Sequence, residues 1–241
     1  MPLVPCPQKE MNDFFQFKQF RIRHDRCAMK VGTDGVLLGA WACVEGRTVL
    51  DIGTGTGLIA LMAAQRNQDA QVLGIEIDEA AARQAQENMA ESPFHSRVSC
   101  CCQDVLTFCP TQRFDAILCN PPFFTEDTLP DDKARALARN NKSLPFALLV
   151  PKVASLLADE GTFSVVIPSQ AVTDFVALCL AEGLHLMRRL AVQTTAKKQP
   201  RRSLLTFTRQ HVACNNEVLI LLNPDGSRSV AYEELTSAFY L

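Results

Sequence analysis

The chain has 241 residues, a formal net charge of −2 and 47% hydrophobic residues, a composition typical of a globular protein that folds in water. No uninterrupted apolar stretch approaches the about 20 residues that span a membrane, and no charged-then-apolar export signal opens the chain. We therefore predict a cytoplasmic protein. Its length suffices for one large α/β domain, and we expect a single domain over 1–241 in which 1–45 form an amino-terminal extension.

The cysteines and histidines do not form a recognisable metal or disulfide pattern. The ten cysteines include no C-x-x-C pair, and the four histidines are scattered without ligand spacing. Cys100, Cys101 and Cys102 are consecutive in an expected strand, where successive side chains face opposite ways. We predict no metal site, and we expect buried, reduced thiols that act as small hydrophobic side chains in a reducing cytoplasm.

The first predicted helix covers residues 36–42. Thr33-Asp34-Gly35, directly before it, has the composition of an amino-terminal cap, because Thr and Asp side chains accept hydrogen bonds from the first N–H groups of a helix. We expect Trp41 to lie in the core.

A glycine-rich turn follows between a strand and a helix. Residues 48–52 are predicted to be a buried parallel strand and residues 58–64 a helix, joined by Gly53-Thr54-Gly55-Thr56-Gly57. Glycines let a backbone approach a ligand closely, and a helix amino terminus offers unpaired N–H groups. The third glycine comes one residue too early for the dehydrogenase fingerprint, and the Lys-Ser or Lys-Thr pair of a Walker loop is missing. The turn therefore predicts a nucleotide-type site of another kind.

An acidic residue ends the second predicted strand, 72–76. This residue, Glu76, comes about twenty residues after the glycine turn, where a carboxylate usually accepts hydrogen bonds from both hydroxyls of a ribose. Asp78 is the alternative, although its place before the predicted helix 79–89 favours a capping role. We expect Glu76 to be the ribose ligand.

A second acid follows the third predicted strand, 98–102. Asp104 is placed to accept the amino group of an adenine, while the backbone N–H of Val105 faces a ring nitrogen. The alternative is an ordinary loop or helix-cap aspartate. The spacing of Asp104 after the glycine turn and Glu76, which both match a nucleotide-type site, favours the ligand role.

The fourth predicted strand, 114–119, ends in Asn120-Pro121-Pro122-Phe123. The prolines remove backbone donors and force a stiff, extended path. An amide and a planar side chain are thereby held together at the carboxyl end of a strand, which is where open α/β sheets bind ligands. This motif predicts a site that binds a flat group bearing an exocyclic amine. The alternative for Phe123, and also for Phe124, is an aromatic side chain in the core.

Strands and helices alternate through the rest of the chain, which predicts an α/β fold with a doubly wound, mostly parallel sheet. The last two strands of this sheet are close enough in sequence to pair antiparallel. The further predicted elements are a helix over 146–157, a strand over 161–167, a helix over 171–180, strands over 184–194 and 204–208, the segment 217–222, a turn at 223–226 and a short helix near 232–239.

Together these motifs resemble those of class I methyltransferases that depend on S-adenosylmethionine (SAM). D-x-G-x-G-x-G beginning at Asp51 is similar to their cofactor loop, and N-P-P-F is similar to the motif of those that methylate planar nitrogens. Phe17-Lys18-Gln19-Phe20 and the stretch 29–41 narrow the resemblance to the bacterial tRNA1(Val) adenine-N6 methyltransferases, over nearly the whole chain. The resemblance implies a Rossmann-like sheet of seven strands with an antiparallel last strand.

The same resemblance implies SAM as cofactor and a set of residues that hold it. In this family the stretch around Lys30 lies near the methionine end of SAM, so that Asp34 would meet the ammonium and Thr33 the carboxylate, as an alternative to capping. The implied SAM-binding residues are Thr33, Asp34, Asp51, Gly53, Gly55, Gly57, Glu76, Asp104, Val105 and Asn120.

The implied catalytic residues are Asn120, Pro121, Pro122 and Phe123. The side-chain carbonyl of Asn120 and the backbone carbonyl of Pro121 would each accept an N–H of the adenine amine, favouring a pyramidal nitrogen and stabilising the positive charge that develops there. Pro122 would fix the turn, and Phe123 would stack on a base extruded from its loop.

A tRNA is the implied partner, with no membrane and no obligate protein partner, although the net charge does not by itself indicate a nucleic-acid binder. Local basic clusters nevertheless offer phosphate contacts. We expect RNA contacts from Arg21, Arg23, Lys197, Lys198, Arg201 and Arg202, in clusters that also include Lys18, His24 and Arg26, and a third cluster comprises Lys133, Arg135, Arg139 and Lys142.

Three alternatives remain at this stage. One is methylation of a glutamine amide in a protein release factor, whose enzymes share the N-P-P-aromatic motif but carry a sizeable helical amino-terminal domain. Another is guanine-N2 methylation of rRNA, whose enzymes often have an additional domain. The third is an inactive SAM-binding partner subunit, which the intact N-P-P-F motif and glycine loop disfavour.

Overall fold

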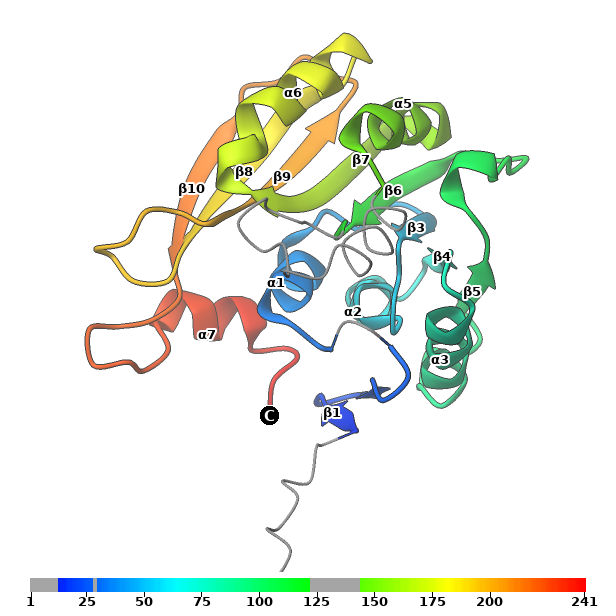
Figure 1. The fold of residues 1–241 in the computed structure, drawn as a ribbon, viewed down its shortest axis with the longest axis horizontal. Coiled ribbons are helices and arrows are strands. Elements are labelled where there is room, and N and C mark those ends of the chain that lie inside the picture. The colour runs from blue at the N-terminus through cyan, green and yellow to red at the C-terminus, as the bar shows by residue number, and fades with distance from the viewer. Residues whose placement is uncertain (1–12, 28–29, 122–143) are drawn as a thin grey trace, which may run out of the picture.

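A computed structural model describes residues 13–27, 30–121 and 144–241, and in this part of the chain eight strands form one sheet (Figure 1). Their order is β10-β8-β9-β7-β6-β3-β4-β5, and β9 alone runs antiparallel to its neighbours, β7 and β8. In chain order the strands are β3 (Thr48–Ile52), β4 (Gln71–Glu76), β5 (Val98–Cys102), β6 (Phe114–Cys119), β7 (Leu157–Pro168), β8 (His185–Gln193), β9 (Arg202–Thr208) and β10 (Asn215–Ile220).

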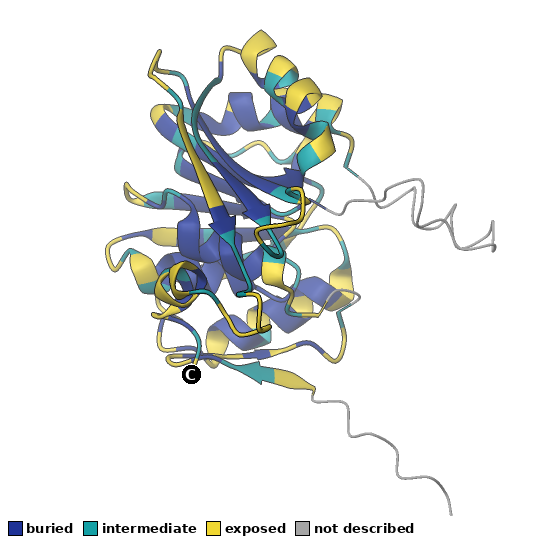
Figure 2. Ribbon diagram, turned by 90° about the vertical axis from the view of Figure 1, so that its left-hand side faces the viewer, coloured by how far each residue is buried: buried dark blue, intermediate teal, exposed yellow. Residues whose placement is uncertain are grey.

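This sheet confirms the doubly wound, mostly parallel prediction but corrects its strand count. The antiparallel strand is the seventh, β9, and the eighth strand, β10, adds in parallel to the outer edge of β8. An edge strand leaves a row of backbone donors and acceptors that another strand can pair with. In β10, Leu219 is buried while Val218 is 61% exposed, so only one side of the strand faces the core (Figure 2).

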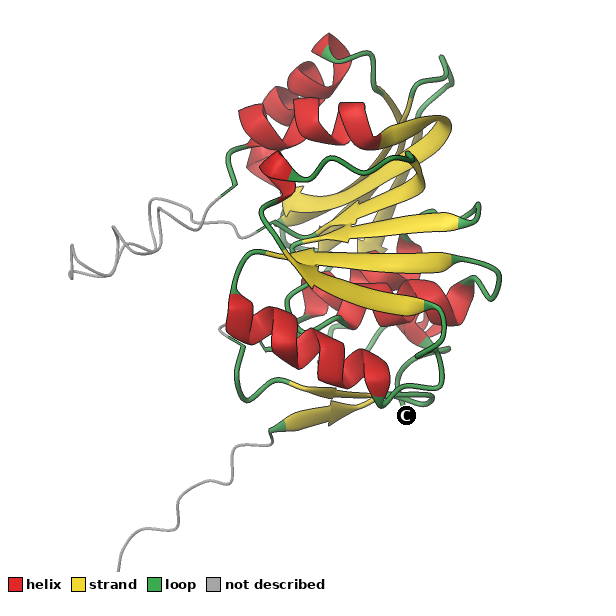
Figure 3. Ribbon diagram, turned by 90° about the vertical axis from the view of Figure 1, so that its right-hand side faces the viewer, coloured by secondary structure: helices red, strands yellow, loops and turns green. Residues whose placement is uncertain are grey.

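Helices cover both faces of the sheet (Figure 3). One hydrophobic cluster joins the sheet to α1, α2, α3 and α7, and a second joins its other face to α5 and α6. The predicted helices are confirmed, with ends shifted by a few residues. They are α1 (Thr33–Trp41), α2 (Leu58–Arg66), α3 (Glu79–Ala90), α5 (Phe146–Leu156), α6 (Val172–Ala181) and α7 (Val230–Thr236), with short 3₁₀ turns η1 (Val105–Thr107) and η3 (Ser169–Ala171).

Near its amino end the described chain forms a two-stranded hairpin of β1 (Phe14–Gln16) and β2 (Arg21–Arg23). Phe17 in its turn is fully buried and lies parallel to the ring of Tyr240, with 6.0 Å between ring centroids. The backbone N–H of Lys18 donates to the carbonyl of Phe239 at 2.9 Å. The two ends of the described chain are thus packed against each other.

The cysteines differ from their prediction. Those in the described residues are free thiols, but only Cys119 and Cys179 are buried, and Cys102 and Cys109 are exposed. Cys100 and Cys101 pack against the two opposite hydrophobic clusters but stay partly exposed, because β5 is the edge strand and side chains of only one neighbouring strand flank them. Among the described helices, none is long and apolar enough to cross a membrane.

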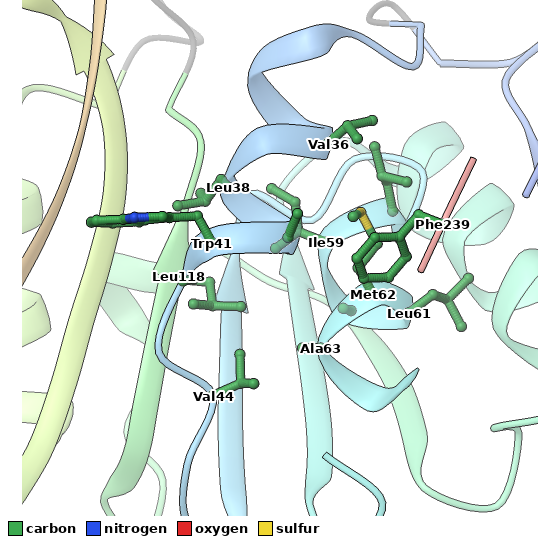
Figure 4. Packing of buried hydrophobic residues seen from close by; sticks show 14 of the residues in the cluster. Val36, Leu38, Trp41, Val44, Ile59, Leu61, Met62, Ala63, Leu118 and Phe239 are labelled. Carbon is green, nitrogen blue, oxygen red and sulfur yellow. The ribbon is translucent and has the colours of Figure 1, made fainter. Parts of the chain in front are cut away.

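Among the described helices, α1 and α2 approach each other closely. Figure 4 shows Met62 of α2 beside the buried side chains of α1 and close to Phe239. A β-carbon added to Gly39 would lie 2.5 Å from the Met62 sulfur and 2.9 Å from its Cβ. Gly39 is therefore needed for the close approach of these helices, and this approach sets where the first turn of α1 lies. Trp41, near the end of α1, is buried as predicted.

We predict that Gly39→Ala lowers the free energy of unfolding by about 1–3 kcal/mol, since the new methyl group overpacks the contact with Met62. Urea unfolding followed by circular dichroism measures this loss. The double variant Gly39→Ala/Met62→Ala removes the contacts with the Met62 sulfur and methyl carbon and keeps only the one with its Cβ, so the two single losses should sum to more than the double variant loses. Strict additivity would contradict the packing explanation.

Candidate functional site

The glycine turn after β3 adopts a backbone that requires its glycines. Gly53, Gly55 and Gly57 have φ of +68°, +56° and +85°, in the left-handed region that other residues rarely adopt. Among the described residues, a β-carbon at Gly53 would meet nothing within 4 Å, and one at Gly55 only the sulfur of Cys27 at 3.9 Å. Open space next to this turn, at the start of α2, fits a ligand that approaches the backbone closely.

Asp51 supports this turn from beneath. Its carboxylate accepts a hydrogen bond from the Thr54 hydroxyl at 2.6 Å and from the Ala60 N–H at 3.2 Å, and its side chain is fully buried. Burial, with a smaller contribution from the charge of Glu76, raises the pKa of Asp51 to about 7 against the lowering effect of these hydrogen bonds. The structure places Asp51 under the loop, where it joins the loop to α2, and gives its carboxylate no exposed surface.

Glu76 lies where the sequence predicts, at the carboxyl end of β4. One carboxylate oxygen accepts the Gly55 N–H at 2.9 Å, and the other accepts the N–H groups of Ile77 and Asp78 at 2.9 and 3.0 Å. The half-buried side chain is therefore held rigidly against the glycine turn. Asp78 caps α3 through the N–H groups of Ala80 and Ala81, which confirms its predicted role. A carboxylate beside a glycine turn suits the hydroxyls of a ribose.

Asp104 follows β5 and caps the 3₁₀ turn η1. One of its oxygens accepts the Leu106 N–H at 2.9 Å, so the capping alternative holds for this oxygen. The side chain is half-buried, and Val105 is buried next to it. Contact between these two residues and an adenine stays a prediction.

Asn120 follows β6 directly, at the same carboxyl edge as Glu76, and is half-buried, while Pro121 is buried. A β-carbon on Gly35 would lie 3.8 Å from the Asn120 side-chain nitrogen. The fold thus brings the first turn of α1 next to the amide of the proline motif. Pro122, Phe123 and the neighbouring Phe124 lie outside the described residues, as does the basic cluster at 133–142.

Thr33 and Asp34 occupy the first turn of α1, so the capping prediction is wrong for them. The helix begins at Thr33, its N-cap is Gly32, and no side chain caps it. The Asp34 carboxylate instead accepts a hydrogen bond from the guanidinium of Arg202 at 2.8 Å, in a partly buried ion pair. This pair joins the start of α1 to the start of β9.

The predicted RNA-binding residues separate into two groups. In the hairpin, the Arg21 guanidinium lies over the Phe14 ring, 4.5 Å from its centroid, and Arg23 forms an ion pair with Glu91 at 3.0 Å. The other group belongs to the loop between β8 and β9, at the carboxyl edge of the parallel strands. Arg202 is paired with Asp34 there, whereas Lys197, Lys198 and Arg201 are exposed.

Two functional candidates were missed at the sequence level. Gln84 and Asn88 stand one turn apart on α3 and are buried, although both carry a polar amide. The available signal was two amides at i and i+4 on a helix face otherwise formed by alanine and methionine. In the described residues, no group of three or more His, Cys, Asp or Glu is arranged to hold a metal ion.

Comparison with known proteins agrees with this geometry. Residues 31–174 match the family model of the methyltransferase small domain. A Bacteroides thetaiotaomicron protein named tRNA1(Val) (adenine(37)-N6)-methyltransferase is 49% identical over 95% of this chain and 98% of its own length. A Citrobacter koseri protein of the same name is 44% identical over 94% of each chain. This chain belongs to their family.

Solved structures agree on the fold of this family member. A protein of Agrobacterium tumefaciens described as a predicted O-methyltransferase superposes with a TM-score of 0.66 at 18% identity, covering 86% of this chain and 96% of that one. A glycopeptide N-methyltransferase complexed with SAM superposes with a TM-score of 0.54 at 12% identity, covering 75% of this chain and all of that one. The methyltransferase is SAM-dependent, and the open glycine turn beside the Glu76 carboxylate fits that cofactor.

We predict that Asp51→Asn flattens the pH dependence of stability. A carboxyl whose pKa is raised on folding favours the folded state below its ordinary pKa near 4, and this contribution is lost as the pH rises toward 7. The wild-type free energy of unfolding should therefore fall by a few kcal/mol relative to the variant between pH 4 and pH 7. Urea titrations at several pH values measure it.

Asp159→Asn is the matched control for this experiment, because that aspartate is exposed and paired only at the surface with Arg113. Asp159→Asn should leave the pH dependence of the free energy of unfolding as in the wild type. If the free energy of unfolding varies with pH in the same way in Asp51→Asn and in the wild type, burial does not raise the pKa of Asp51.

Proposed function

We propose that this methyltransferase transfers the methyl group of SAM to N6 of adenosine 37 in tRNA1(Val). The observation that carries the proposal is the position of Asn120, beside the first turn of α1 and at the same sheet edge as the glycine turn. The similarity of nearly the whole chain to enzymes of that name supports the same substrate.

The residues proposed to hold SAM lie along the carboxyl ends of β3, β4, β5 and β6. The backbone of Gly53, Gly55 and Gly57 borders the open space, and the fixed Glu76 carboxylate is proposed to accept the ribose hydroxyls. SAM supplies a methyl group already activated by its sulfonium. Asp104 and Val105 are proposed to face the adenine of the cofactor. Thr33, Asp34 and Asn120 are proposed at its methionine end, with Asp51 acting through the loop that it supports.

Asn120 and Pro121 are proposed to act on the substrate amine. The lone pair of an adenine N6 is delocalised into the ring, so the amine is a poor nucleophile. The Asn120 side-chain carbonyl and the Pro121 backbone carbonyl are proposed to accept its two N–H groups and to stabilise positive charge as it develops on the nitrogen. Pro122 and Phe123 would fix the turn and stack on the base, which is extruded from the anticodon loop. Water takes the proton afterwards.

The tRNA is proposed to contact the loop between β8 and β9. Lys197, Lys198 and Arg201 are exposed on this loop, which begins and ends at the edge that holds Asn120. Such cations bind phosphates without reading sequence. Arg202 is proposed to contact RNA while it stays paired with Asp34. Arg21 and Arg23, in the hairpin, are proposed to contact a more distant part of the RNA. We also propose that the chain acts in the cytoplasm as one domain over 1–241, extended at 1–45, without an obligate protein partner.

We predict that Asn120→Ala lowers methyl transfer by at least about a hundredfold, the effect of losing one preorganised acceptor in a transition state. SAM affinity should fall by no more than about tenfold, the effect of the one hydrogen bond that Asn120 is proposed to make at the methionine end of SAM. The assay follows label from methyl-labelled SAM into total tRNA, rRNA or a release factor, and calorimetry measures SAM binding. Asn215→Ala, on the exposed edge strand, is the control.

Two outcomes would contradict the proposal. Label in the release factor or rRNA rather than in tRNA would exclude the adenosine substrate. A loss of SAM affinity in Asn120→Ala as large as the loss of methyl transfer would show that Asn120 acts on the cofactor and not on the substrate amine.

We predict that Lys197→Ala/Lys198→Ala/Arg201→Ala weakens tRNA binding and leaves SAM affinity unchanged. Each lost phosphate contact reduces the slope of log affinity against log salt by about 0.7–0.9. Filter binding at several salt concentrations measures the slope. Arg113→Ala is the control, because Arg113 directly precedes β6 and so lies at the amino ends of the parallel strands. A triple variant whose salt dependence equals that of the wild type would exclude this loop from the interface.

A further inference from the structure

Two buried amide side chains of α3, Gln84 and Asn88, have no part in the proposed catalytic site. Gln84 is fully buried and Asn88 is 2% exposed, on a helix face otherwise made by small or apolar side chains. A buried amide destabilises a core unless its donors and acceptors are paired. Both amides find partners in residues 23–27, which we call the amino-terminal strap.

Asn88 joins this strap to the glycine turn. Its side-chain oxygen accepts the Arg23 N–H at 2.9 Å, and its nitrogen donates to the Arg23 carbonyl at 3.0 Å. The same nitrogen donates to the carbonyl of Thr56 at 2.9 Å. One buried side chain therefore holds two backbone segments that are far apart in sequence, each through its main chain.

Within the described residues, the hydrogen bonds of the Gln84 side chain go to the strap and none goes to the glycine turn. Its side-chain oxygen accepts the Arg26 N–H at 3.3 Å, and its nitrogen donates to the Asp25 carboxylate at 2.6 Å. The next strap residue, Cys27, has its sulfur 3.9 Å from the position of a β-carbon on Gly55. The strap thus runs alongside the turn that is proposed to bind SAM.

We propose that Asn88 is a positioning residue that couples docking of the strap to the SAM-binding shape of the glycine turn. This inference rests on the proposed function only in taking SAM as the ligand of the turn. Tight SAM binding requires the docked strap, and bound SAM in turn holds the strap in place. The two effects are equal by thermodynamic linkage.

The physical basis of the coupling is the peptide group that Asn88 holds. Thr56 stands between Gly55 and Gly57, both in the left-handed conformation, where glycine has many alternatives of similar energy. A hydrogen bond to the Thr56 carbonyl selects one of them. Without it, the turn is in its binding shape for a smaller fraction of the time, and the apparent SAM affinity falls by that fraction.

The test compares amide-to-leucine variants of α3, which keep approximate size and remove the hydrogen bonds. Asn88→Leu should raise the SAM dissociation constant about tenfold, the effect of one to two hydrogen bonds. Gln84→Leu loses hydrogen bonds to the strap but none to the glycine turn, so it should raise the SAM dissociation constant by a smaller factor than Asn88→Leu. Gln86→Leu, on the exposed face of the same helix, should leave it unchanged. Calorimetry without RNA measures all three, so a failure of the proposed tRNA activity leaves this readout intact.

A purely structural role for Asn88 gives a different result. In that case Asn88→Leu lowers the melting temperature while the SAM dissociation constant, measured well below melting, stays at the wild-type value; this outcome overturns the proposal. If Asn88→Leu does not fold, hydrogen exchange of the wild type decides. SAM should slow exchange of the Arg23 and Arg26 amides at least about tenfold, in line with the linked affinity, and unchanged exchange contradicts the coupling.

Discussion

The site depends on a left-handed glycine backbone that two carboxylates hold in place. Asp51 supports the turn from inside the core through Thr54 and the start of α2, and Glu76 accepts the Gly55 N–H from the next strand. Glycine adopts this conformation without steric cost but also has many alternatives, so the turn needs fixed acceptors to keep one shape. Burial of Asp51 raises its pKa to about 7, which makes part of this support sensitive to pH.

The amino-terminal part of the chain contacts the candidate site at two places. The strap is held by the amides of α3, and α1 reaches Asn120 because Gly39 lets it approach α2 closely. The pair of Asp34 and Arg202 then links α1 to the loop proposed to contact tRNA. A methyltransferase that acts on a weak nucleophile needs such fixed geometry, since orientation and electrostatics are what the protein contributes.

Local patterns predicted most of the fold and much of the site. The alternation of strands and helices, the glycine spacing and the places of Glu76 and Asn120 at strand ends follow from short stretches of sequence, as does the cap at Asp78. The eighth strand was not predicted, because an open sheet edge accepts a strand without a distinctive pattern. Exposure of Cys102 likewise depends on β5 being the last strand on its side.

By itself the sequence determined the class of fold, the cofactor turn and the amide–proline motif, because backbone conformation and the alternation of strands and helices are encoded by neighbouring residues. Only the tertiary structure decided which side chains pair across the chain. Asp34 is engaged by Arg202, 168 positions away, and Asn88 by Arg23, 65 positions away. Pairing over such separations depends on which surfaces the packed core brings together, and no local spacing records it.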